Sequence, residues 1–294
     1  MAKAVITRSR AVLRQPGSAV LQAGGWALLY LILAMVAVLQ VLPLIWLVFF
    51  SLKNNQEVFN LSPFALPLHP RWGNYTKVWT EGQIGHYFMN SVWITVTAVA
   101  LTVLLASMVT YAITRMRWRN RSLVLGLFMT GMMIPVHSTL IPLFSLFSDF
   151  NLKDHPLSVI LSYTAFNMPI TIMILLGAYY ALPREIEEAA VMDGCTVNRM
   201  FFRVVLPMTI SVLTTTVIIN MIYNWNEFIF VNTFISSDHL KTLTVGVQNF
   251  VGQYSTDWGA IGATLVISML PIVVAFFILS EQIMEGVTAG AVKG

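Results

Sequence analysis

Charged side chains are scarce in this chain, yet seven of them gather between positions 184 and 203. Four are acids and three are arginines, namely Glu185, Glu187, Glu188, Asp193, Arg184, Arg199 and Arg203. Catalysis would need a nucleophile beside its base, or a metal beside its ligands, and the stretch offers neither. Carboxylates separated by small residues can instead meet the arginines of another protein at close range. We therefore interpret this stretch as a contact surface.

The local pattern of the stretch predicts two short helices. Pro183 suits the first turn of a helix, acids follow where the helix dipole favours them, and Gly194 is placed to end the helix. Thr196 can cap a second short helix through Arg203, after which Pro207 marks the start of the next apolar run. A helix lying on lipid headgroups would carry Lys and Arg on its polar face. Because the first helix carries glutamates instead, a protein groove suits it better.

A second polar group, Asn224-Trp225-Asn226-Glu227, lies inside an apolar run. A carboxylate in such a run is costly and marks a candidate functional site. The two amides and the carboxylate can bond to sugar hydroxyls while the ring of Trp225 stacks on a sugar face. Two alternatives stay open: Trp225 anchors the chain at the membrane interface, or Glu227 pairs with a neighbouring subunit. Asn167 and His137, each close to a proline, are weaker candidates for contact with the same ligand.

Composition places these groups in a membrane protein. The 294 residues are 57% hydrophobic and 10% charged, with a mean hydropathy of +0.74, whereas soluble domains are about 25% charged. A membrane helix needs roughly 20 apolar residues, whereas barrel strands show alternation over about ten. The apolar runs are continuous, so we predict an all-α membrane protein with six transmembrane helices. The predicted spans are 26–50, 91–113, 122–147, 157–180, 208–235 and 259–280.

Positive charge in the connections predicts the orientation, because cytoplasmic loops carry the excess of Lys and Arg. With the N-terminus inside, twelve of the 17 Lys and Arg fall on inner segments. We therefore predict cytoplasmic ends, 1–25 and 286–294, around one membrane domain at 26–285. The stretch 183–207 is then a cytoplasmic loop between the fourth and fifth spans. The long connection at 51–90 is predicted to form an outer cap of short helices and turns.

Several other functions are disfavoured by the residues. The basic residues flank helix ends without interleaved aromatics, so we predict contact with lipid headgroups and no nucleic acid. A single cysteine, Cys195, permits no intramolecular disulfide, and the five histidines show no metal-ligand spacing. A nucleotide-binding P-loop needs a lysine after a glycine, and no lysine here follows one. We expect no catalytic residue, metal site or bound cofactor in this chain.

Part of the cytoplasmic stretch resembles a known signature. It reads Glu188-Ala189-Ala190, Gly194 after three residues, Val204 after nine more, and Leu206-Pro207 after one more. This order and spacing is similar to the EAA motif of permease subunits of binding-protein-dependent ABC importers, with Val204 for Ile as the only departure. The similarity extends across nearly the whole chain and narrows to the carbohydrate-uptake class, such as the second permease of maltose-type systems. The residues that carry it are SLK at 51–53, NY at 74–75, NS at 90–91, MIP at 133–135, WNEF at 225–228 and GVTAGAVKG at 286–294.

The resemblance implies a fold and a set of partners. Such a subunit has six helices and pairs with a related permease chain, so that each forms half of the translocation path. The EAA loop forms a coupling helix seated in a cleft of a separate ATPase dimer, which uses ATP and Mg²⁺, and the terminal tail approaches that dimer. A sugar-binding protein outside the prokaryotic plasma (inner) membrane delivers the substrate. The implied ATPase-coupling residues are Glu185, Glu188, Ala189, Ala190, Asp193, Gly194, Leu206 and Pro207.

Two rival functions are weighed against this importer. An ion-coupled secondary transporter would use Glu227 as a proton or cation site, but such folds usually carry internal repeats, and none is evident here. A membrane scaffold without transport would tolerate a bulky residue in place of Gly194. The importer predicts that the same replacement abolishes uptake and transport-linked ATP hydrolysis.

Overall fold

The computed structural model describes residues 16–251 and 256–291, with side chains for 25–251 and 256–278. Parts of the predicted terminal segments therefore lie outside the described residues. Within the described ranges the chain is helical and forms no β-strand beyond one isolated bridge, from Val251 to Thr256. The elements are α1 (Pro16–Ser51), α2 (Asn55–Asn60), α3 (Gly73–Thr80), α4 (Ile84–Arg115), α5 (Arg121–Gly131), η2 (Val136–Thr139), α6 (Leu140–Asp149), α7 (Pro156–Ala181), α8 (Arg184–Met192), α9 (Val197–Met200), the π-helix η3 (Phe201–Val205), α10 (Leu206–Met208), α11 (Ile210–Asn226), α12 (Ile229–Phe234), η4 (Asp238–Leu240), α13 (Leu243–Gly246), η5 (Val247–Phe250) and α14 (Trp258–Ala291).

Four of the predicted spans lie inside single long helices. The stretches 26–50, 91–113, 157–180 and 259–280 fall within α1, α4, α7 and α14. Each of these helices holds an apolar segment long enough to cross a membrane. α4 begins earlier than predicted because Ile84, Tyr87 and Ser91 recur at helical spacing and are all buried.

Two predicted spans are not single helices, which corrects the expectation of one helix over 122–147 and one over 208–235. α5 and the η2–α6 segment meet at 97°, with Pro135 at the break, where it removes a backbone donor. α11 ends at Asn226, and α12 begins only after Glu227, whose backbone is extended. A further bend of 79° separates α10 from α11. The described residues thus hold four unbroken candidate spans, or six where each bent pair counts as one.

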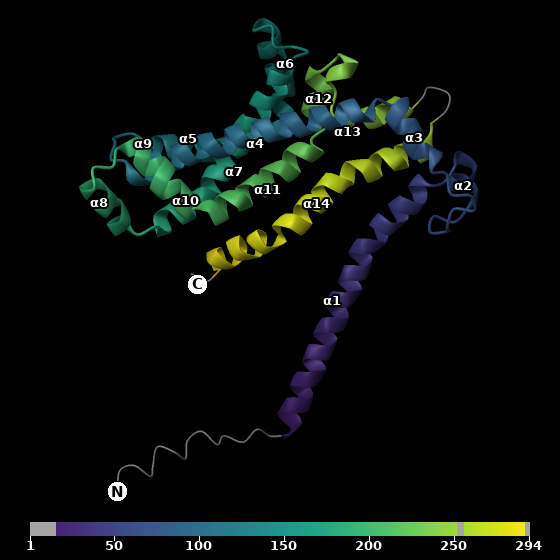
Figure 1. The fold of residues 1–294 in the computed structure, drawn as a ribbon, viewed down its shortest axis with the longest axis horizontal. Helices are drawn as coiled ribbons and strands as arrows, with labels where there is room; N and C mark the ends of the chain where they lie inside the picture. Colours follow the sequence, from purple (N-terminus) through teal and green to yellow (C-terminus); the bar gives the residue numbers. More distant parts are fainter. Residues whose placement is uncertain (1–15, 252–255, 292–294) are drawn as a thin grey trace.

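The body of the molecule is a bundle of α4, α7, α11 and α14 (Figure 1). α4 packs along α7, and α11 packs against both of them and against α14. Polar groups inside a bilayer must find partners within the protein, because no water is available there. Two side-chain hydrogen bonds meet this need between α7 and α11, from Asn220 to Thr171 (2.9 Å) and from Asn167 to Asn224 (2.6 Å). A third, from Tyr163 to Glu227 (3.0 Å), joins α7 to the residue just after α11.

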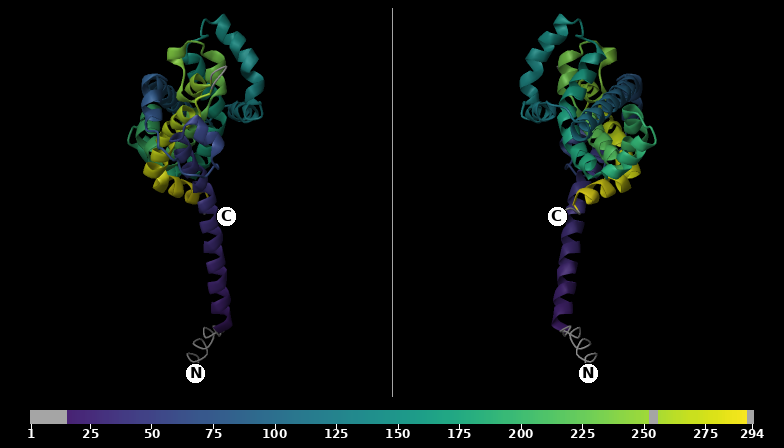
Figure 2. Two further views of the ribbon diagram at one scale, coloured as in Figure 1. Left: turned by 90° about the vertical axis from the view of Figure 1, so that its right-hand side faces the viewer. Right: turned by 90° about the vertical axis from the view of Figure 1, so that its left-hand side faces the viewer.

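α1 stands apart from this body in every view (Figures 1 and 2). None of its most apolar segment is buried. Its closest approach to α14 is near its C-terminal end, where a Cβ on Gly262 would lie 2.8 Å from the Cα of Ser51 and 2.7 Å from the ring of Phe50. The described part of the chain therefore leaves most of the apolar surface of α1 uncovered.

Short helices gather at the two ends of the bundle. α8, α9 and α10 lie at one end, beside the C-terminal ends of α4 and α7 (Figure 1). The opposite end holds α2, α3 and α13, together with the end of α1 and the start of α14. The stretch predicted to be cytoplasmic and the predicted outer cap thus lie at opposite ends of the bundle. The cap consists of α2, α3 and turns, as expected.

Candidate functional site

α8 forms as its local pattern predicts. It runs Arg184–Met192, directly after Pro183, with acids in its first turn. Gly194 follows with φ +76, a left-handed conformation that strains any residue with a Cβ. The amides of Gly194 and Cys195 each donate to a carbonyl of the helix end at 2.9 Å. The helix is therefore closed by a tight turn that depends on glycine.

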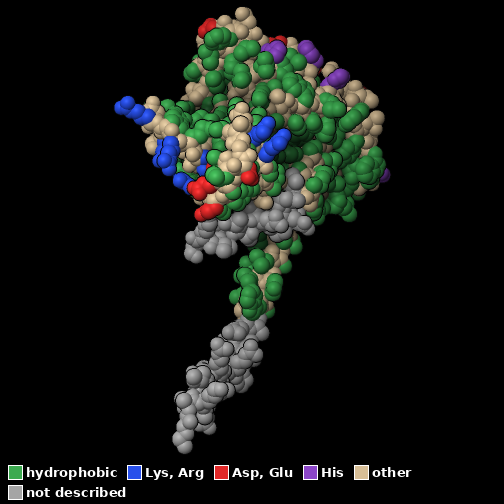
Figure 3. Space-filling view, turned by 60° about the vertical axis from the view of Figure 1, so that its left-hand side comes forward, with side chains coloured by type: hydrophobic (Ala, Val, Ile, Leu, Met, Phe, Trp, Pro, Cys, Tyr) green, Lys and Arg blue, Asp and Glu red, His purple; other side chains and the backbone are tan. Residues whose placement is uncertain are grey.

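Most of the predicted coupling residues face outward from α8 and the segments beside it. The exposed ones are Glu185, Glu188, Ala189, Asp193, Gly194 and Pro207. Ala190 and Leu206 are half-buried and pack against the apolar cluster between α4, α7 and η3. Figure 3 shows charged side chains gathered at this end of a face that is otherwise mostly hydrophobic. The surface offers carboxylates and small side chains to another molecule.

One acid of the first turn, Glu187, faces inward instead. Its Oε1 lies 3.1 Å from Nε of Arg115, the last residue of α4. The side chain of Arg115 is 5% exposed, and Nη2 donates to the carbonyl oxygens of Tyr179 and of Leu182 (2.8 Å). The sequence pattern includes Glu187 in the acidic cluster but not among the predicted coupling residues. From the sequence, Arg115 contributes only a positive charge to the orientation argument. Its contact with Glu187 could not be predicted, because α4 and α8 are far apart in the chain.

The second short helix is longer than predicted. Helical backbone runs from α9 through the π-helix η3 into α10, so Pro207 lies in a last turn instead of starting the next span. Pro207 lacks the N–H that would bond to the carbonyl of Arg203, and the wider π-helical turn just before it accommodates that loss. Thr196 stands at the N-cap as predicted, but its side chain makes no capping hydrogen bond to the described residues.

A cavity of about 260 Å³ lies between the two breaks in the bundle. Val136 and His137 line it from the break between α5 and α6, and Glu227 lines it from the break between α11 and α12. Its polar lining consists of His137, Tyr163, Asn167, Tyr223, Asn224 and Glu227. Four predicted candidates, namely Asn224, Glu227, Asn167 and His137, are thus brought together from three parts of the chain. The two tyrosines were missed, because only the packing of α7 on α11 turns them toward the same space.

Glu227 is held at the break between α11 and α12 by three hydrogen bonds that it accepts, besides the one that its amide donates to Asn224 (3.4 Å). Its carboxylate accepts from the hydroxyl of Tyr163 at 3.0 Å and from the amide of Phe230 at 2.9 Å. Its backbone carbonyl accepts from the hydroxyl of Thr244 at 2.8 Å. The carboxylate therefore caps the first turn of α12, as an N-cap side chain does. Each carboxylate oxygen keeps a second lone pair that a ligand hydroxyl could use.

Trp225 and Asn226 do not line this cavity. Trp225 is buried against Phe88, and its indole N–H donates to the carbonyl of Ser268 at 2.9 Å. Asn226 is exposed, and its amide bonds back to the carbonyl of Ile222. The four-residue group predicted from the sequence is thus divided, because successive residues of a helix point in different directions.

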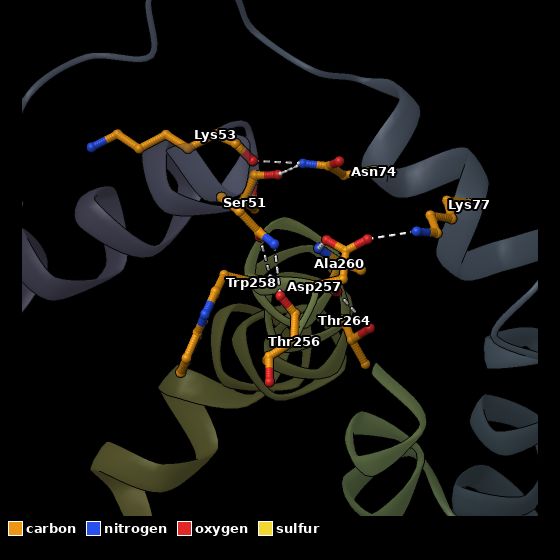
Figure 4. Close-up of polar contacts among 10 residues, drawn as sticks. Ser51, Lys53, Asn74, Lys77, Thr256, Asp257, Trp258, Ala260 and Thr264 are labelled. Carbon is orange, nitrogen blue, oxygen red and sulfur yellow. Dashed lines mark hydrogen bonds and ion pairs between the residues drawn. The ribbon is translucent and has the colours of Figure 1, made fainter. Parts of the chain in front are cut away.

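A polar junction joins α1, α3 and α14 at the opposite end of the bundle (Figure 4). The side chain of Asn74 donates to the carbonyls of Ser51 (2.8 Å) and Lys53 (3.1 Å). Lys77 and Asp257 form an ion pair at 2.6 Å. An open cavity of about 1040 Å³ adjoins the junction.

The ion pair shifts the pKa of both partners. The hydrogen bond to Asp257 raises the pKa of Lys77 above its ordinary value. Burial by itself would raise the pKa of Asp257, but the hydrogen bonds from Lys77 and from the amide of Ala260 bring it below its ordinary value. Both groups are therefore charged at neutral pH, and Asp257 also caps the start of α14.

Metal binding finds no support among the residues that the structure describes. They contain no group of three or more His, Cys, Asp or Glu side chains that could hold an ion. The exposed face of α8 and the cavity between the breaks hold most of the site residues predicted from the sequence.

Residues 102–287 match the family described as "Binding-protein-dependent transport system inner membrane component". The chain belongs to this family. It is 34% identical over 271 residues to the probable ABC transporter permease protein YurM of Bacillus subtilis, covering 92% of this chain and 88% of that one. It is 32% identical over 253 residues to the sulfoquinovosyl glycerol transport system permease protein SmoH of Agrobacterium fabrum, covering 86% and 88%.

A solved structure has the same fold as this permease. It is a bacterial ABC transporter involved in the import of the acidic polysaccharide alginate, with a TM-score of 0.76 at 19% identity, covering 92% of this chain and 98% of that chain. The permease is a multi-pass inner-membrane subunit of an ABC importer, and ATP hydrolysis belongs to a separate subunit. This membership favours the ATP-driven importer over the ion-coupled transporter.

Proposed function

We propose that this permease forms half of the membrane path for a sugar or oligosaccharide. The other half would come from a second, related permease chain. Support for the substrate class comes from two proteins that this chain resembles: one is named for sulfoquinovosyl glycerol transport and the other imports alginate. The carbohydrate-class segments of the sequence, from SLK at 51–53 to the terminal tail, agree with that class.

α8 is the coupling helix of this proposal, and its exposed face is the observation that carries it. Glu185, Glu188 and Asp193 reach arginines of the ATPase subunit, while Ala189 lets its surface come close and Gly194 provides the turn that ends α8. Closure of the ATPase dimer, driven by ATP and Mg²⁺, displaces α8. The spans then rock between inward-facing and outward-facing states.

The proposed topology has six crossings, with each bent pair counted as one, and both termini in the cytoplasm. The placement of α8 and of the α2–α3 cap at opposite ends of the bundle supports it. The excess of Lys and Arg at the α8 end agrees with the same orientation. A sugar-binding protein would then dock at the cap, beside the cavity of about 1040 Å³.

The substrate path runs past the cavity between the two breaks. Glu227 and Asn167 offer oxygen and amide groups to sugar hydroxyls there, together with Tyr163 and Tyr223. Trp225 supports the path indirectly, because its hydrogen bond to Ser268 holds α11 against α14. The exposed Asn226 contacts the substrate or the second permease.

Reconstitution tests this function. Proteoliposomes with this permease, its partner permease, the ATPase subunit and the binding protein would be offered radiolabelled maltotriose, raffinose, diacetylchitobiose and alginate oligosaccharides. We expect ATP-dependent uptake of one class, which vanadate stops and a proton ionophore leaves intact. Uptake that follows an ion gradient without ATP would contradict the proposal, and so would uptake of radiolabelled amino acids, offered in parallel, with none of the sugars transported.

A further inference from the structure

Arg115 is buried at a position where the neighbouring arginines are exposed. Its side chain is 5% exposed, whereas Arg117, Arg119 and Arg121 all lie on the surface. A guanidinium remains charged under all physiological conditions, so its burial is costly unless charges or carbonyl groups surround it. The groups that compensate for this charge therefore indicate what Arg115 holds together.

Three groups from three consecutive parts of the chain contact the guanidinium. Nη2 donates to the carbonyl of Tyr179 in the last turn of α7 and to that of Leu182 in the connection after it (2.8 Å). Nε lies 3.1 Å from Oε1 of Glu187 in the first turn of α8, an ion pair between two buried atoms that lacks hydrogen-bond geometry. Carbonyls at a helix C-terminus lack donors from their own helix, and a cation there also suits the helix dipole.

The contacts of Arg115 cross the joint between α7 and α8. That joint consists of Leu182 and Pro183, both extended, so two residues alone would let α8 swivel relative to α7. Arg115 binds the joint on both sides and belongs to a third helix, α4. Behind it, α4 and α7 are packed through a buried cluster that includes Tyr111 and Tyr179.

We propose that Arg115 is a positioning residue that makes α8 move as one piece with α4 and α7. This inference rests on the proposed role of α8 as the ATPase contact. When the ATPase displaces α8, the contacts of the Arg115 guanidinium transmit the displacement to α4 and α7. Without them, the connection at Leu182 and Pro183 would bend and the two helices would stay in place. Glu187 is the residue of α8 that Arg115 holds. It points inward, whereas Glu185 and Glu188 point outward, so its proposed role differs from theirs.

A distance measurement tests the link without any sugar. Spin labels on Met192→Cys of α8 and Met108→Cys of α4, both on exposed side chains, would be placed in a Cys195→Ser background within the assembled transporter. We expect one narrow distance distribution, unchanged between the nucleotide-free and the ADP-vanadate-trapped states. In Arg115→Gln the distribution should become at least twice as wide, or shift on trapping. The same narrow distribution in the variant would overturn the proposal.

A coupling measurement accompanies it. We expect Arg115→Gln to lower sugar uptake at least tenfold while ATP hydrolysis by the complex stays within twofold of wild type. Glu187→Gln removes only the ion pair with α8 and should lower sugar uptake by an intermediate amount. This variant keeps the test informative if Arg115→Gln does not assemble. Arg119→Gln, an exposed neighbour, is the matched control. A wild-type ratio of uptake to hydrolysis in Glu187→Gln would overturn the proposal, whereas a wild-type complex without ATP-dependent uptake would overturn the proposed function instead.

Discussion

The hydroxyl of Tyr163 donates to the carboxylate of Glu227 at 3.0 Å, and this bond joins α7 to the break between α11 and α12. The second oxygen of the same carboxylate caps α12 through Phe230. One acidic side chain therefore sets the direction of α12 and lines the cavity beside it. Glu227 therefore supports the fold at this break and lines the proposed substrate path, so we expect its replacement to have graded consequences.

We expect substitutions at Glu227 to lower the uptake rate more when they remove more of its hydrogen bonds. Glu227→Gln keeps one acceptor, whereas Glu227→Ala removes both. A hydrogen bond to a charged group contributes about 1.5–3 kcal/mol, so we expect a fall of roughly tenfold for Gln and a larger one for Ala. Tyr163→Phe should resemble Glu227→Gln, with Tyr180→Phe, an exposed tyrosine of the same helix, as its control. Initial uptake rates in proteoliposomes measure the effect. Normal uptake by assembled Glu227→Ala would remove this residue from the substrate path.

Gly194 is expected to tolerate replacement according to backbone conformation and not according to size. Its φ of +76 strains residues with a Cβ, by about 1–2 kcal/mol, and most of all β-branched ones, while no atom lies near enough to clash with an added Cβ. Gly194→Val should therefore lose most uptake and transport-linked ATP hydrolysis, whereas Gly194→Asn, which suits this conformation, should keep much of both. Equal loss in the two variants would show that side-chain bulk at the ATPase surface decides instead.

Gly262 is expected to be required for the contact between α1 and α14. An added Cβ would lie 2.8 Å from the backbone of Ser51, so Gly262→Ala forces the helices apart, at a cost of about 1–3 kcal/mol. Gly177→Ala, in an open position of α7, should instead be neutral or slightly stabilising. Thermal unfolding of the detergent-purified transporter compares them. A midpoint in Gly262→Ala as high as in Gly177→Ala would contradict this view of the junction.

The ion pair of Lys77 and Asp257 is expected to contribute stability over a wide pH range. The pKa of Asp257 is below its ordinary 3.8, so its contribution is present above that value and is lost as the pH falls through the lowered pKa. The pKa of Lys77 is above its ordinary 10.5, so its contribution is present below that value and is lost as the pH rises through the raised pKa. Both side chains are partly exposed, which limits the effect to about 1 kcal/mol.

Asp257→Asn provides the corresponding measurement. Its amide oxygen still accepts from Ala260, so the variant removes the charge and little else. We expect a constant lowering of the unfolding midpoint between about pH 5 and pH 9, which shrinks toward zero in strong acid. A difference that grows as the pH falls would show that the charge of Asp257 is not what stabilises the junction.

Local features of this protein could be predicted because short-range interactions determine them. α8 begins after Pro183 and ends before Gly194, since a proline, a run of acids and a left-handed turn act within one or two helical turns. The long apolar runs of α4 and α7 could be predicted for the same reason. Pro135 indicates a bend in its apolar run, because a proline removes a backbone donor. The size of that bend and the break at Glu227 could not be predicted, because an apolar run indicates burial and says little about the direction of the chain.

The sequence by itself determined that this is a helical membrane permease with an acidic, small-residue helix on one side, since composition, charge balance and the spacing from Glu188 to Pro207 are properties of the chain. Only the tertiary structure decided which side chains act together. It turned Trp225 away from the cavity and brought Asn167 to Glu227, and it joined Arg115 to Glu187. Such contacts depend on how distant helices pack, and that packing depends on all of their faces at once.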